Sequence, residues 1–400
     1  MNNRISSSMM YDQSVYLMLA KQSKLNHLER QLATGQKLVS AKDDPVASGT
    51  AVGMDRILAE LDQLGANAAN VQNRLGLQEN ALAQAGELLQ RVSDLTIQAN
   101  NAALSAEDRK SVSAELRSIR ESLLSLANST DGNGRFLFGG TADGVAPFAA
   151  NNGTILYNGD QTQRQVEVAP GSFVQDALPG SEIFMRIRTG DGTVDGSAAA
   201  GNTGQAVLTG ASRDGSTAWS GDSYTVRFTG PGAYDILDSG GATVGSGTYA
   251  EGDDLVFQGL RVRMSGVPAA GDEFTVGQAG NRDVFSTIDR LSQALQMDTS
   301  TLAGRTAQQN LLQSSLRDVA RAAEKMIDSR ASGGAQLSAI DNAASLREAN
   351  AITLKDSLSQ LRDLDYAEAI GQYKLEGAAL QAAQTVFTQM QSMSLFNMIR

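Results

Sequence analysis

The feature that most constrains this chain is a heptad repeat of apolar residues that begins at Ile57. Over six heptads the spacing alternates between four and three, with one clearly polar break at Gln78: Ile57, Leu61, Leu64, Ala68, Val71, Leu75, Gln78, Leu82, Ala85, Leu89, Val92, Thr96 and Ala99. Such a repeat is typical of a helix that packs in a coiled coil or a helical bundle. At the rise of an α-helix, the repeat predicts a helix roughly 65 Å long.

Helical patterns continue on both sides of the middle of the chain. Ser105, placed before Glu107 and Asp108, predicts the N-cap and acidic first turn of a second helix, and Asp131–Gly134 predicts its end. Later, apolar residues predict a short helix over 284–295 and a long one over 312–361, softened locally at two adjacent glycines, Gly333 and Gly334. Because each helix has an apolar stripe to cover, we expect the two ends of the chain to pack into one bundle.

The composition changes abruptly between Pro147 and Gly280. This stretch holds 24 of the 40 glycines, five of the six prolines and no lysine, and its 15 acidic residues outnumber its seven arginines. Short segments that alternate apolar and polar residues predict a half-buried antiparallel sheet: 164–168, 183–188, 224–228, 260–264 and 274–276. Asp191–Gly196 is faintly similar to a calcium loop but lacks its carboxylate spacing, so we expect a plain turn there.

These patterns predict an α+β fold, in which a long antiparallel helical bundle from both chain ends carries an inserted antiparallel β domain. The expected domains are a terminal helical assembly domain (1–41 with 366–400), a long-helix bundle (42–145 with 281–365) and a glycine-rich acidic β domain (146–280). An insertion of one composition into another is the usual mark of such a boundary.

Several classes of function are disfavoured by what the sequence lacks. There is no cysteine, and the single histidine, His27, lies in a polar helical stretch where we expect an exposed side chain. We therefore expect no enzyme, metal site or cofactor. The net charge of −11 argues against a nucleic-acid partner, and no apolar run is long enough to span a membrane. No signal-peptide-like apolar stretch follows Met1–Met10, so we expect no cleaved signal.

The extreme ends differ from the bundle, because their apolar residues are too few to form a core yet too many to leave in water. These side chains either pair within the subunit or pack between subunits, and the concentration of Met, Leu and Phe at the very end favours packing between subunits. The predicted assembly residues are Leu25, Leu28, Leu32, Leu380, Phe387, Met390, Leu395 and Phe396. Between the terminal helix and the bundle, Asp43, Asp44 and Pro45 predict a capped turn that sets the offset of the two.

Four segments in order resemble the flagellin superfamily. They are Asn3–Ser6 with Met9–Tyr11, Leu32–Lys37 with Ala41–Pro45, Leu126–Gly140, and Met393–Ile399. The third is the most specific, and the resemblance covers residues 1–150 and 280–400. The opening and the Met- and Phe-rich tail are more similar to the proteins of the hook–filament junction than to filament flagellins. The glycine-rich insertion carries no motif of the family.

The resemblance implies a structural, self-assembling subunit of the bacterial flagellum that acts as an adapter between hook and filament. It implies that the terminal helices form the inner tube of a helical assembly. It also implies type III export without a cleaved signal, an extracellular location, and a dedicated export chaperone. The implied neighbours are hook-associated protein one, flagellin and copies of the chain itself. The alternatives are a filament flagellin subunit and, less favoured, a secreted coiled-coil adhesin whose β domain is the binding module.

Overall fold

The computed structural model describes residues 7–100 and 104–396, and these divide into two compact units. One unit combines the described parts of Met1–Ala66 and Ala343–Arg400, and the other is Asn67–Asn342. Two long helices contribute to both units: α2, Pro45–Ala99, and α5, Leu302–Arg362. The predicted α+β class, with helices from both chain ends and an inserted antiparallel β domain, is confirmed.

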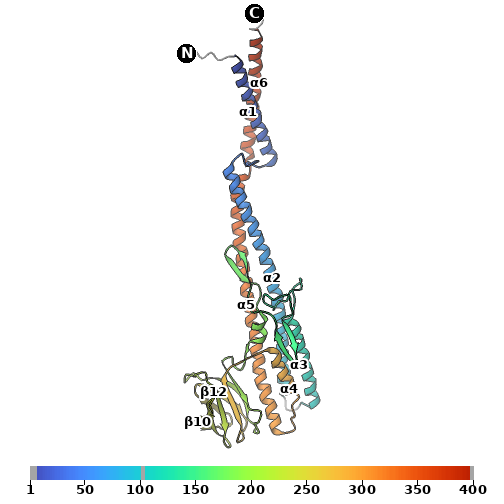
Figure 1. The fold of residues 1–400 in the computed structure, drawn as a ribbon, viewed down its shortest axis with the longest axis vertical. Coiled ribbons are helices and arrows are strands. Elements are labelled where there is room, and N and C mark those ends of the chain that lie inside the picture. Colours follow the sequence, from blue (N-terminus) through green and yellow to red (C-terminus); the bar gives the residue numbers. More distant parts are fainter. Residues whose placement is uncertain (1–6, 101–103, 397–400) are drawn as a thin grey trace. The chain divides into compact units, whose positions relative to one another are not determined.

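The terminal unit is built around a helical hairpin whose two arms come from opposite ends of the sequence. Helix α1, Ser7–Thr34, packs antiparallel against α6, Tyr366–Phe396, and the two lie side by side (Figure 1). At the base of the hairpin the two connections exchange main-chain hydrogen bonds. The Lys37 amide donates to the Arg362 carbonyl at 2.8 Å, and the Leu364 amide donates to the Gly35 carbonyl at 3.0 Å. These two hydrogen bonds fix the register of α1 relative to α6 at the base of the hairpin.

The helical part of the second unit combines α2 and α5 with α3, Ala106–Ala127, and α4, Val284–Ala294. The predicted N-cap is confirmed, because the Ser105 hydroxyl accepts from the Asp108 amide and the Asp108 carboxylate accepts from the Ser105 amide. The heptad stripe of α2 is buried from Ala68 onward. Its polar break, Gln78, is buried as well: it donates to the carbonyl and accepts from the amide of Leu178, so a loop is fixed to the bundle there.

The β part of this unit contains two sheets and three short pairs of strands, all antiparallel. The pairs are β1–β2 (Phe148–Asn151, Thr154–Tyr157), β3–β4 (Gln165–Ala169, Ser172–Gln175) and β5–β14 (Ile187–Arg188, Asn281–Arg282). A five-stranded sheet has the order β10 (Thr243–Thr248), β9 (Ala233–Leu237), β8 (Tyr224–Phe228), β13 (Glu273–Gln278) and β6 (Val194–Ala198). A three-stranded sheet has the order β11 (Asp254–Phe257), β12 (Leu260–Ser265) and β7 (Val207–Arg213).

The two sheets enclose an apolar core of their own, which includes Val226, Phe228, Val262, Phe274 and Val276. The helical core is separate and is closed by a group of phenylalanines. Phe148 and Phe184 have ring centroids 5.5 Å apart, and Phe138 meets Phe184 edge-on at 5.3 Å. Edge-to-face pairs of this kind add to the stabilisation from burial alone.

The structure tests local predictions at residues 183–188, at the two glycines of α5 and at Asp191. The strand predicted over 183–188 is wrong: Ser181–Met185 form a π-helix, and only Ile187–Arg188 are extended. Ile183 and Phe184 are both fully buried, and a strand would send two successive side chains to opposite faces. At Gly333 and Gly334, where the sequence predicted a local softening of the helix, α5 continues as an α-helix. The turn at Asp191 is confirmed, since its carboxylate accepts from the Thr193 and Val194 amides.

Candidate assembly surface

The seam of the terminal hairpin follows heptads on both helices. On α1 it contains Met18, Lys21, Leu25, Leu28 and Leu32; on α6 it contains Ala369, Glu376, Leu380, Ala383, Phe387 and Met390. Near its far end, the rings of Tyr11 and Phe387 have centroids 5.1 Å apart. The heptad side chains are buried or half-buried, so the helices cover one another along this line, whereas Tyr11 stays 48% exposed. The seam has the pattern of a short antiparallel coiled coil.

A polar group interrupts the seam at its middle. The Lys21 and Lys24 ammonium groups lie 2.8 and 2.7 Å from the two carboxylate oxygens of Glu376, whose side chain is 12% exposed. Hydrogen bonds from Lys21 and then Lys24 lower the pKa of the Glu376 carboxyl to about 2. Because a seam shifted by one heptad would leave this carboxylate without its cations, the group specifies the register of α1 on α6.

The structure places six of the predicted assembly residues in this seam. Leu28 is buried, and the remaining five are half-buried between the two helices: Leu25, Leu32, Leu380, Phe387 and Met390. Leu395 and Phe396 belong to the last turn of α6, and their side chains lie outside the described residues. Pairing within the subunit therefore accounts for much of the burial of the six.

Sequence reasoning missed a different set of apolar residues, those the hairpin leaves exposed. We call them the hairpin apolar face: Met9, Met10, Tyr16, Leu17, Leu19, Ile370, Tyr373, Leu375 and Val386. Tyr16 is 73% exposed and Leu375 is 69% exposed. The signal was present in the sequence, because the heptad seam does not use these apolar positions. Large exposed apolar side chains gathered on one part of a subunit are a common mark of protein–protein contact.

The turn at the base of the hairpin is held by both predicted aspartates. The Asp44 carboxylate accepts from the Val46 and Ala47 amides at 3.0 and 2.9 Å, and Pro45 is the first residue of α2, so the helix cap is confirmed. Asp43 binds back into the loop, accepting from the Ser40 amide at 2.8 Å, and that hydrogen bond is the main cause of its lowered pKa.

The sequence predicted an exposed His27 side chain, and the structure differs from that prediction. His27 is half-buried, and its Nδ1 lies 3.9 Å from the Asp43 carboxylate.

In the second unit, the motif that most resembles flagellins closes over a buried arginine. Arg74 of α2 is 6% exposed and donates to the Phe136 carbonyl at 2.9 Å. Its guanidinium also lies 3.7 to 3.8 Å from three carboxylates, those of Asp131, Asp143 and Asp176. The motif therefore attaches the segment after α3 to the bundle, and this role is structural.

The described part of the chain offers no centre for metal chemistry: within residues 7–100 and 104–396, no three His, Asp or Glu side chains are grouped to hold an ion. In the same residues, none of the helices combines the length and the apolar character that a membrane span requires.

A family model, the bacterial flagellin N-terminal helical region, matches residues 5–143. Together with the paired terminal helices and the inserted β domain, this match defines the class as a flagellin-like structural protein.

Individual relatives are more specific. FlgL of Xanthomonas campestris, a crystal structure, is 59% identical, covers 76% of this chain and 99% of its own, and superposes with a TM-score of 0.73. The flagellar junction protein FlgL of Legionella pneumophila is 27% identical over 72% of this chain and 98% of its own, with a TM-score of 0.66. Flagellar hook-associated protein 3 of Salmonella typhimurium is 26% identical over 99% of this chain and 100% of its own length.

The chain belongs to the family of flagellar hook-associated protein 3, the FlgL junction proteins. It is a structural component of the bacterial flagellum and not an enzyme, as the sequence predicted.

Proposed function

We propose that this protein joins the hook side of the flagellum to the filament side through its terminal hairpin. The observation that carries the proposal is the hairpin apolar face, whose residues remain exposed although the seam beside them is closed. Exposed apolar patches on a folded subunit are typical of protein–protein contacts. Contacts between different surfaces of neighbouring copies generate rings or helical assemblies, as an axial structure requires.

The two sets of hairpin residues then have separate tasks. Leu25, Leu28, Leu32, Leu380, Phe387 and Met390 stabilise the hairpin and its register, while the apolar face contacts neighbouring subunits. Leu395 and Phe396 at the end of α6 remain candidates for direct assembly contacts. The capped turn at Asp43, Asp44 and Pro45 sets where the hairpin ends and α2 begins. In this proposal residues 1–41 with 366–400 form the assembly domain, 42–145 with 281–365 the bundle, and 146–280 the outer β domain.

The proposed neighbours are hook-associated protein one on one side, flagellin on the other, and further copies of this chain. An export chaperone would cover α6 before assembly, since Ile370, Tyr373, Leu375 and Val386 are exposed on that helix. We propose type III export without a cleaved signal and an extracellular position in the flagellum. The flagellar family and a sequence without cysteine are consistent with that route.

The test is complementation of cells that lack the gene, observed by electron microscopy. The cells without the gene should keep the hook, lose the filament and release flagellin into the medium. A variant with Tyr16→Ser, Leu19→Ser and Tyr373→Ser should fail to restore the filament. The matched control, Val256→Ser at an exposed apolar position of β11, should restore it. A normal filament without the gene contradicts the adapter role, and restoration by the triple variant contradicts the assembly surface.

A further inference from the structure

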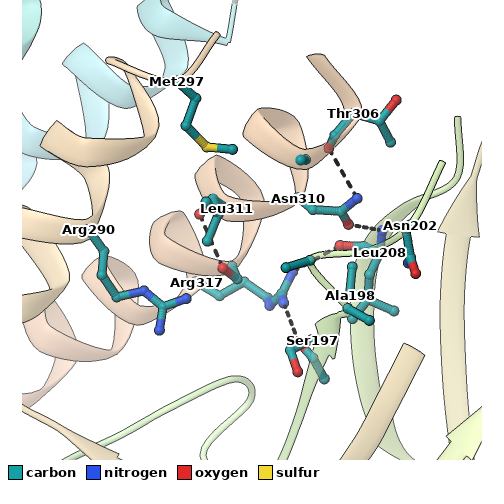
Figure 2. A pocket seen from close by; sticks show the side chains of 15 residues that line it. Ser197, Ala198, Asn202, Leu208, Arg290, Met297, Thr306, Asn310, Leu311 and Arg317 are labelled. Carbon is teal, nitrogen blue, oxygen red and sulfur yellow. Dashed lines mark hydrogen bonds between the residues drawn. The ribbon is translucent and has the colours of Figure 1, made fainter. Parts of the chain in front are cut away.

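A cavity in the second unit lies between the β part and the helices α4 and α5. Its volume is about 160 Å³, and its walls come from β6 and β7 on one side and from α4, α5 and their connection on the other (Figure 2). Leu208, Met297 and Leu311 line it together with several alanines. An apolar cavity of about 150 Å³ is large enough for benzene, so this one has room for a ligand of about six non-hydrogen atoms.

Two arginines, Arg290 and Arg317, give this apolar cavity a charged wall. Arg290 extends from α4 toward Arg317 of α5 (Figure 2). Arg317 donates only to main-chain carbonyls: those of Leu208, Thr209 and Gly196, each at 3.3 Å. Within the described residues, neither guanidinium has a carboxylate inside the 4.0 Å of an ion pair. Burial lowers the pKa of both Arg290 and Arg317, as expected for cations that have lost water without gaining a close anion.

The acidic groups nearby do not neutralise the pair. Asp195 and Asp318 are the carboxylates whose charges act on both arginines. Asp318 is already ion-paired with Arg282 and accepts from the Gly190 amide, and Asp195 accepts from the Gly196 amide. The two aspartates therefore carry two negative charges for the three positive charges of Arg282, Arg290 and Arg317. One positive charge remains uncompensated beside the cavity. This local excess is unusual in a chain whose net charge is −11.

The geometry points to a binding site for a carboxylate on a short aliphatic stem. The carboxylate would accept from the free donors of Arg290 and Arg317, and the stem would lie against Leu208, Met297 and Leu311. Hydrogen bonds between a guanidinium and a carboxylate are among the stronger ones in proteins, more so in a site shielded from water. Both a small free carboxylate and a glutamate side chain from another protein chain have this chemistry.

The probe for the test is sodium butyrate, which has six non-hydrogen atoms, added to the full chain with ¹³C-methyl-labelled methionine. We expect the Met297 methyl resonance to shift saturably, with a dissociation constant on the order of 1–10 mM for a ligand of this size. 1-Butanol, which lacks the charge, should not reproduce the shift. N-acetylglutamate amide distinguishes the sources, because only the five non-hydrogen atoms of its side chain would enter the cavity and its backbone would stay outside. Binding at least as tight as that of butyrate assigns the site to an acidic side chain, and weaker or absent binding assigns it to a small free carboxylate.

Variants locate the site. Arg290→Gln and Arg317→Gln should each weaken butyrate binding about tenfold or more. Ala307→Leu, which fills the cavity and keeps both arginines, should abolish it. Arg321→Gln is the matched control, because Arg321 lies on the same helix and pairs with Glu324 outside the cavity. A Met297 shift that does not saturate, that 1-butanol reproduces, or that survives the Arg290 and Arg317 substitutions overturns the inference.

Discussion

Leu28 provides the sharpest test of the hairpin, because it is the most buried apolar side chain of α1 and is 5% exposed. Replacing it with alanine removes three carbons from the seam, each contributing about 0.8 kcal/mol, and adds the cost of a small cavity. Leu25 and Leu32, its neighbours along α1, are half-buried and can move toward the gap, so the lower part of the usual range applies, about 2–3 kcal/mol. That free energy corresponds to a roughly 30- to 150-fold increase in the equilibrium constant for opening the hairpin.

Amide hydrogen exchange, read by mass spectrometry on α1 and α6 peptides of the free subunit, measures this opening directly. The increase should be confined to the terminal unit, with peptides of α3 and α4 unchanged. Leu17→Ala is the matched control on the same helix: Leu17 is 53% exposed, so its replacement should change the opening free energy by less than about 0.5 kcal/mol. Equal effects of the two substitutions, or α1 peptides that exchange at unfolded rates in the unsubstituted protein, would refute the seam.

Three further outcomes follow from named contacts. The pKa of Glu376 is about 2 against an ordinary value of 4.5, so its contribution to the hairpin is complete above pH 4.5 and is lost as the pH falls toward 2. Exchange corrected for intrinsic rates should show this loss, and Glu376→Gln should remove it. Gly35 has φ +70°, and a Cβ there would lie 2.7 Å from the Tyr366 hydroxyl, so Gly35→Ala should weaken the hairpin by about 1–2 kcal/mol, whereas Gly371→Ala, in open helical space, should not. Arg74→Met should lower the urea midpoint of the second unit by the equivalent of about 1–3 kcal/mol, because Asp131 loses its ion-pair partner and the Phe136 carbonyl loses its donor. Asp143 and Asp176 keep other arginine partners, Arg135 and Arg164. An unchanged midpoint would show that the cluster is not stabilising.

The helices could be predicted from the sequence because their signals are local. The heptads from Ile57 and the Ser105 cap depend on residues within a turn or two of each other, and both predictions are confirmed. The strand over Tyr224–Phe228 was also found, since its alternation matches a sheet with one buried face. Strands such as β9 and β10 were missed, because glycines and aspartates weaken the alternation there and pairing partners supply the remaining stabilisation.

The candidate site was predicted less well than the fold. The sequence indicated that the ends of the chain carry unusual apolar residues, but a periodic pattern does not reveal which face another segment of the same chain will cover. Leu28 meets α6 and Leu17 does not, although both are leucines of one helix. Lys21 is a charged residue within the α1 heptad, and its position is explained only by Glu376, 355 residues away in the sequence.

Site-specific photo-crosslinking in assembled flagella tests the central claim most directly. A photoreactive residue at Leu19 or Tyr373 should crosslink this chain to neighbouring flagellar proteins, including other copies of itself, while the same residue at the exposed Val256 of β11 should give few or no such products. Crosslinks between chains from Val256 alone, with Leu19 and Tyr373 reacting only within their own chain, would contradict the terminal hairpin as the assembly surface.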